Sequence, residues 1–127
     1  MQEKHLFEYA VIRVVPRVER EEFMNVGVIL YCASQKYLNV VFNVNEELFN
    51  AFKSELELSV VTANLKAIAI ICEGGTNCGP IGNLDIASRS RWLTATRSTV
   101  VQASKVHPGF CKDAAEMLAD LHQNLVL

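Results

Sequence analysis

The 127-residue sequence lacks the cysteine and histidine spacings that mark a metal site. It has four cysteines and no C-x-x-C motif, and no two of its three histidines lie three to five residues apart. These absences exclude the common zinc sites, and the sequence indicates no metal and no cofactor. Cys72 and Cys78 flank a glycine-rich segment, where they could oxidise together, but free or buried thiols are the interpretation that we favour.

Long apolar runs are missing as well. The longest one, Leu65–Cys72, contains Lys66 and is much shorter than a membrane span. The first ten residues, MQEKHLFEYA, lack the uninterrupted apolar stretch of a signal peptide. We therefore expect a cytoplasmic protein with reduced thiols and no membrane association.

The chain has little net charge, but its charges are unevenly spread. A formal charge of −2 argues against general nucleic-acid binding, so nucleic acid is an unlikely partner. Residues 46–57 hold four glutamates and one lysine, whereas residues 86–112 hold five basic residues and no acidic one. The basic segment suits either an anion or an acidic protein partner, and a merely solvated basic face is the alternative.

What is present predicts one α+β domain over residues 1–127. Apolar residues make up 50% of the chain, which is enough for a core of its own. Strands are expected at 7–15, ending at Pro16, and at 25–32 and 37–43, which together form an antiparallel meander. Gly27 inside the second strand indicates a bulge or a close approach of two backbones.

The apolar spacing then becomes helical. Helices are expected at 46–56, capped by Asn45, at 59–73, ended by Gly74, and from Asp113 onward. We also expect a short helix or irregular turn at 85–94, a fourth strand at 98–104 and a turn at 107–109. The fold class is therefore α+β, with a mostly antiparallel sheet of about four strands and about three helices covering one face.

Two polar segments, 13–28 and 89–109, contain side chains that a core does not need. Arginine forks beside hydroxyls and amides suit a phosphate or carboxylate, and we expect the two segments to meet in space. An ion pair between Arg13 and Glu22, with Arg20 as the alternative donor, would lock the intervening loop and is the purely structural interpretation. The candidate polar site comprises Arg13, Arg20, Glu22, Asn25, Arg91, Arg97, Ser98, Thr99, Gln102 and His107.

Two aromatic side chains in the second segment also have two interpretations. His107 stands before Pro108 and Gly109, where a turn residue is more common than an acid or base working near neutral pH. Trp92 is expected to anchor the core or an interface rather than to stack on a ligand.

Both polar segments resemble a known family. The residues YAVIRVVP from Tyr9 to Pro16, with Arg20 and EFMNVGV from Glu22 to Val28, are similar to the opening of the bacterial domain-of-unknown-function family 3037. The residues RWLTATRSTVVQ from Arg91 to Gln102, followed by VHPG, resemble the second block of that family. The resemblance implies a small cytosolic bacterial protein that is often encoded beside a HipA-like kinase, and it implies no catalytic residues.

Three functional classes follow from these residues. We favour a non-enzymatic interaction or regulatory module, with a HipA-like kinase as the candidate partner. The alternative is an enzyme or binding protein for a phosphorylated or carboxylated small molecule at the arginine-rich cluster. A nucleic-acid factor ranks last. For the first class we expect Arg89, Arg91 and Lys105 to be exposed and to attract an acidic partner.

Overall fold

A long first strand organises the sheet. The computed structural model of the chain describes residues 4–17, 22–51, 56–75, 79–95 and 101–127. The described elements, in chain order, are β1 (His5–Arg17), β2 (Glu22–Cys32), β3 (Tyr37–Phe42), α1 (Glu46–Ala51), α2 (Leu58–Glu73), α3 (Gly79–Gly82), α4 (Ile86–Thr94), β4 (Val101–Ala103), β5 (His107–Cys111) and α5 (Ala114–Leu125).

The sheet is antiparallel and runs in the order β3-β2-β1-β4. β1 is long enough to pair with two short strands along its outer edge, with β4 at residues 12–14 and with β5 at residues 5–9. The predicted meander is therefore confirmed, and the fourth strand pairs with the first. The predicted close approach at Gly27 is confirmed too, since a Cβ there would lie 2.7 Å from the Val41 carbonyl oxygen.

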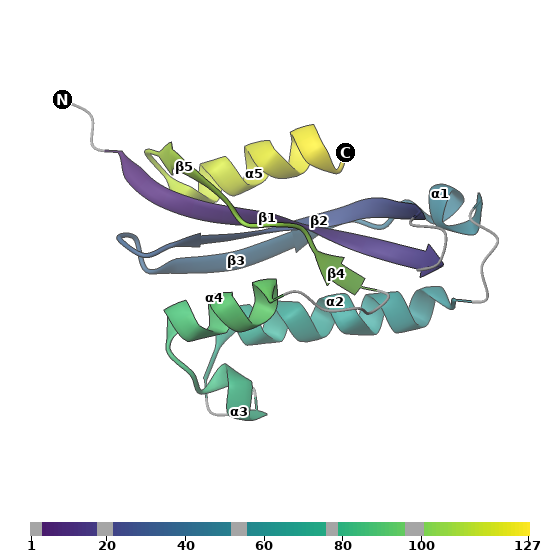
Figure 1. Ribbon diagram of the computed structural model, residues 1–127, viewed down its shortest axis with the longest axis horizontal. Helices are drawn as coiled ribbons and strands as arrows, with labels where there is room; N and C mark the ends of the chain where they lie inside the picture. Colours follow the sequence, from purple (N-terminus) through teal and green to yellow (C-terminus); the bar gives the residue numbers. More distant parts are fainter. Residues whose placement is uncertain (1–3, 18–21, 52–55, 76–78, 96–100) are drawn as a thin grey trace.

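Helices lie on both faces of this sheet. Figure 1 shows α2 and α4 on one side and α5 on the other. The α+β class is confirmed, but the expectation that the helices cover a single face is wrong. The physical reason lies in β1, where consecutive residues Ala10, Val11 and Ile12 are all buried, and a strand that is buried on both sides needs a cover on both sides.

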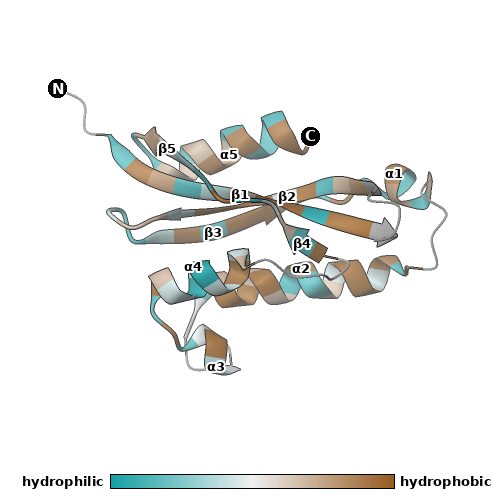
Figure 2. Ribbon diagram, in the orientation of Figure 1, coloured by the Kyte–Doolittle hydropathy of each residue, from teal (hydrophilic) through white to brown (hydrophobic). Residues whose placement is uncertain are grey.

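Each face has its own apolar core, and Figure 2 shows brown, apolar residues throughout β1–β3 and along the helices. The core under α2 and α4 is built around Val14, Val26 and Leu65. The core under α5 contains Phe7 and Leu118. Among the described helices, none is long and apolar enough to cross a membrane.

The helix ends lie where the capping residues and the glycine of the sequence predict them. The Asn45 side chain accepts a hydrogen bond from the Leu48 N–H at 3.1 Å, and Asp113 accepts one from the Ala115 N–H at 2.8 Å. Gly74, with φ of 74°, ends α2 in a conformation that favours glycine. The region expected as a short helix or turn at 85–94 forms the helix α4.

Two expectations about proline and glycine were wrong. β1 continues through Pro16 to Arg17 instead of ending before it. The predicted turn at 107–109 is part of β5, an edge strand, where a proline without an N–H is tolerated. Gly109 is needed there for packing, because a Cβ would lie 2.6 Å from the ring of Phe7.

Candidate functional site

Arg13 lies at the centre of the polar residues that the structure brings together. In the sheet it stands directly opposite Asn25 of β2 on one side and Gln102 of β4 on the other. Directly opposed residues of antiparallel strands point to the same face of a sheet. The two polar segments of the sequence thus contribute neighbouring side chains at this point.

This group faces the side on which α5 packs. The Asn25 amide nitrogen donates a hydrogen bond to the Leu125 carbonyl oxygen, in the last turn of α5, at 3.1 Å. The half-buried guanidinium of Arg13 lies over the Phe23 ring, with its central carbon 4.4 Å from the ring centroid. A cation over an aromatic face is attracted by the ring quadrupole. Phe23 itself is 50% exposed, so the pair lies at the edge of α5 rather than beneath it.

Three buried polar atoms have no hydrogen-bond partner among the residues that the structure describes. They are Nε of Arg13, Oδ1 of Asn25 and Nδ1 of His122, the last from the second half of α5. Each such atom costs about 1–3 kcal/mol relative to a satisfied one. Burial also lowers the pKa of His122. The Asn25 amide cannot be turned around, since the Leu125 carbonyl only accepts, so Oδ1 must remain the unsatisfied acceptor.

His107 lies farther along the same face. It stands opposite Tyr9 in the β1–β5 pairing, and the two rings are 5.3 Å apart. His107 is exposed and Tyr9 is half-buried. Tyr9 shares the face of Arg13 because side chains two or four residues apart in a strand point the same way.

We call this surface the open strip. α5 contacts β2 and β3 more extensively than β1, and several side chains on the outer part of the same face are partly exposed. Its members share this face and are all at least partly exposed: Tyr9, Arg13, Phe23, Gln102 and His107.

The two arginines of α4 do not join the open strip, because α4 packs on the opposite face of the sheet (Figure 1). Arg91 is exposed and donates a hydrogen bond to the Ser88 hydroxyl at 3.2 Å. Arg89 was expected to be exposed and is not. It is half-buried and donates to the carbonyl oxygens of Ile71 and Cys72, at 2.8 and 2.7 Å, at the end of α2. Arg89 therefore caps a helix C-terminus.

The remaining sequence candidates lie outside the described residues. These are Arg20, Arg97, Ser98 and Thr99, while Glu22 is described as part of β2 without its side chain. The predicted Arg13–Glu22 ion pair, and the part of the predicted meeting of the two segments that involves Arg20 and Arg97, consequently remain predictions. Trp92, expected as an anchor, is 37% exposed on α4.

Sequence reasoning missed three residues of this region. It placed Tyr9 in the first strand and Phe23 in the loop before the second, without a role for either, and His122 was not considered. The alternation of β1 carried a usable signal for Tyr9, because it stands four residues from Arg13. No local signal marks His122, since its place depends on how α5 docks.

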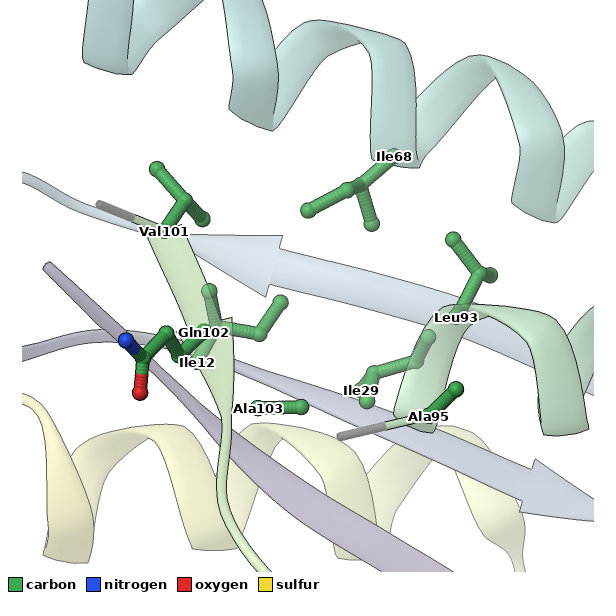
Figure 3. A pocket seen from close by; sticks show the side chains of 8 residues that line it. All are labelled: Ile12, Ile29, Ile68, Leu93, Ala95, Val101, Gln102 and Ala103. Atoms are coloured by element: carbon green, nitrogen blue, oxygen red, sulfur yellow. The ribbon is translucent and has the colours of Figure 1, made fainter. Parts of the chain in front are cut away.

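The face under α2 and α4 has a small apolar cavity of about 40 Å³ beside Gln102. Figure 3 shows the Gln102 side chain pointing away from α2, while Ile12, Ile68 and Leu93 point into the cavity. A space of about 40 Å³ is far smaller than the pockets that hold small-molecule ligands. Among the described residues, no cluster of His, Cys, Asp or Glu could hold a metal ion.

Comparison with known proteins gives one match. A family model described as "Protein of unknown function (DUF3037)" matches residues 9–126. No curated protein and no solved structure matches the chain.

Proposed function

Because this chain belongs to the DUF3037 family, whose description assigns no activity, we propose a function from its geometry: a non-enzymatic interaction module that binds a protein partner through the open strip. The observation that supports this proposal is the incomplete cover of one sheet face. α5 extends over β2 and β3 and leaves Phe23 50% exposed beside a half-buried Arg13.

The composition of the open strip suits a protein interface. Tyrosine, phenylalanine and arginine are enriched in interfaces, and a few such residues carry most of the binding energy. Tyr9 and His107 form one ring pair, and Arg13 and Phe23 form a cation–π pair. Both pairs hold their rings in place before a partner arrives, which reduces the entropy lost on binding.

The unsatisfied atoms favour a polypeptide over a simple anion. Nε of Arg13 needs an acceptor, whereas Oδ1 of Asn25 needs a donor. A carboxylate or a fully ionised phosphate ester offers acceptors alone and would leave Asn25 unsatisfied. A peptide group offers one donor and one acceptor, and because both atoms are buried, the side chains of Arg13 and Asn25 would both have to move to meet it.

The second candidate function is an enzyme or binding protein for a phosphorylated or carboxylated small molecule. The observation that favours it is Arg13 itself, a half-buried cation flanked by Asn25 and Gln102. Arginine beside amides is a common way to hold a carboxylate.

The family resemblance names the partner to test first, a HipA-like kinase, in the bacterial cytoplasm. The half-buried cation Arg13 of the open strip supports a partner whose contact surface is acidic. Exposed Lys105, between β4 and β5, would add to the attraction without being part of the buried contact.

The test measures the affinity of the chain for a HipA-like kinase from the same bacterium by isothermal titration at low salt. Phe23→Ala and His107→Ala each remove an exposed ring from the open strip. We expect each to weaken binding about tenfold or more, as loss of an interface anchor does. The matched controls are Val60→Ala and Ile70→Ala, at 44% and 49% exposed positions of α2, which should change the affinity less than about twofold.

Two outcomes would overturn the proposal. Equal losses for the α2 controls would show that the open strip is not the contact surface, and no association at low salt would exclude the kinase. A rise in melting temperature with inorganic phosphate or citrate that Arg13→Met abolishes would support the small-anion candidate instead.

A further inference from the structure

The outer edge of β3 is unpaired in the described part of the chain. β3 ends the sheet order β3-β2-β1-β4, and no described strand pairs with its outer side. At the opposite side of the sheet, β4 and β5 pair with the outer edge of β1. These two strands carry the usual protections of an edge, since β4 has only three residues and β5 contains Pro108.

β3 has none of these protections. Its sequence, YLNVVF, contains no charged residue, no proline and no glycine. In an antiparallel pair, alternate residues direct both backbone groups to the same neighbour. Asn43, just after β3, donates its N–H to the Val26 carbonyl oxygen of β2 at 2.7 Å. The backbone groups of Leu38, Val40 and Phe42 therefore point outward, as a template for one more strand.

A side chain occupies part of this template. The Val40 N–H donates to Oδ1 of the preceding Asn39 at 2.9 Å, which agrees with its outward direction. Such local bonds from an asparagine offer the backbone an alternative to a strand partner. Asn39 is exposed, so its amide can turn away when a strand takes its place.

The helices beside β3 decide what can pair with it. Among the strands, α2 contacts β3 most, and α5 packs over β2 and β3. A second copy of the chain, paired edge to edge, would bring its own α2 to about the strand spacing of 4.8 Å from the first. Packed helices need about 8–10 Å between their axes. The edge therefore fits a bare extended segment and does not fit a second copy.

The charges at the two ends of β3 give the incoming segment its pattern. Exposed Lys36 precedes β3, and exposed Glu46 and Glu47 follow it in the first turn of α1. A segment antiparallel to β3 brings its first residues toward the glutamates and its last residues toward the lysine. Opposite charges on neighbouring strands attract and like charges repel. The segment that fits has a basic residue before its strand and an acidic residue after it.

We propose that the outer edge of β3 binds an extended segment of another protein as an additional antiparallel strand. The segment has no helix packed on it, is rich in β-branched residues, and has a basic first and an acidic last residue. Its backbone bonds to Leu38, Val40 and Phe42. This site does not rest on the proposed function, because the open strip lies toward the opposite edge of the sheet, where β4 and β5 pair with β1.

The probe is the peptide KTVTVTVTE with blocked ends, and its matched control is KTVTPTVTE. Both carry the same charges, but the central proline cannot donate to the outward carbonyl oxygen of Val40. Isothermal titration with the full chain at low salt measures both affinities. We expect saturable binding of the probe and an affinity at least about tenfold lower for the control.

Charge variants of the chain test the recognition of the peptide ends. Lys36→Glu turns an attraction into a repulsion and should weaken binding of the probe about threefold or more. Lys105→Glu, an equal change of charge at an exposed position between β4 and β5, is the matched control and should leave the affinity unchanged. High salt should reduce the difference between the two variants.

Amide exchange measured by NMR tests the pairing residue by residue. The probe should slow exchange at Leu38, Val40 and Phe42, whose N–H groups point outward. It should leave Asn39 and Val41 unchanged, because their N–H groups point to β2. A nitroxide on the first residue of the probe should broaden the signals of residues 43–47 and spare those of residues 33–36, as an antiparallel strand requires.

Four results would overturn the proposal. Equal affinities for the two peptides would exclude strand pairing, and equal losses in Lys36→Glu and Lys105→Glu would exclude recognition of the ends. Slower exchange confined to residues outside β3 would place the peptide elsewhere. A chain that sediments as a dimer on its own, with slow exchange at Leu38 and Phe42, would show that a second copy occupies the edge.

Discussion

The two faces of the sheet are covered differently. Under α2 and α4, the core is apolar and contains fully buried residues such as Val14, Val26 and Leu65. Under α5, apolar packing around Leu118 gives way, toward the end of the helix, to Arg13, Asn25 and His122, each with a buried unsatisfied atom. A single helix also leaves Phe23 and His107 exposed. The first face stabilises the fold, and the second retains polar groups that stability alone does not require.

This difference predicts unequal costs of substitution. The largest cost should follow Leu65→Ala, which leaves a cavity under α2 where the side chain is 0% exposed. We expect a loss of about 3–5 kcal/mol in the free energy of unfolding. Leu125→Ala, at the half-buried end of α5, should lose only about 1–2 kcal/mol. Urea denaturation of both variants measures the contrast, and equal losses would mean that the two faces are packed alike.

Arg89 and Arg91 provide a second contrast, within one helix. Arg89→Ala removes two hydrogen bonds to the carbonyl oxygens that end α2. We expect it to lower the free energy of unfolding by about 1–3 kcal/mol, since these bonds come from a charged donor. Arg91→Ala, at an exposed position two residues on, should stay within about 0.5 kcal/mol. A larger loss in the free energy of unfolding for Arg91→Ala than for Arg89→Ala would contradict this account.

The substitution Arg13→Met distinguishes a functional role of Arg13 from a structural one. The substitution removes a buried unsatisfied donor and keeps most of the apolar length of the side chain. We expect the free energy of unfolding to change by less than about 1 kcal/mol, and partner binding to be lost. A loss above about 2 kcal/mol, measured by urea denaturation, would instead support a structural ion pair of Arg13, as predicted for Glu22.

The smallest effect concerns pH. Burial lowers the pKa of His122 in the folded chain below its value of 6.5 in the unfolded chain. The unfolded chain therefore binds a proton more readily, and stability falls as the pH drops through 6.5. Replacement of His122 by Gln should reduce this slope between pH 7.5 and 5.5. Thermal melting at both pH values tests the expectation, and an unaltered slope in the His122 variant would contradict it.

Much of the fold was predictable because its signals are local. Asn45 and Asp113 cap helices through their own side chains, and Gly74 ends α2 through its own φ angle. The missed features depend on distant partners. The sequence predicts a turn where β5 lies, because proline and glycine are common in turns. The glycine at position 109 is needed because the ring of Phe7 leaves no room for a side chain there.

The candidate site was predictable in part for the same reason. Arg13, Asn25 and Gln102 stand out as polar residues within apolar strands, and strand pairing then brings them together. The exposure of Arg89 was predicted wrongly, because its sequence neighbours do not reveal that its side chain reaches Cys72, 17 residues earlier in the chain. Helices on the second face of the sheet could have been predicted from β1, because consecutive apolar residues are unusual in a strand with one solvent-exposed face.

The most direct test of the central claim is amide hydrogen exchange of the chain with and without a HipA-like kinase, the proposed partner. The account predicts that the partner slows exchange in residues 9–13, 22–25 and 101–109, which carry the open strip. Exchange in α2 and α4 should be unchanged. Slower exchange confined to α2 and α4, with no change along the open strip, would contradict the claim that the partly uncovered face of the sheet is the binding surface.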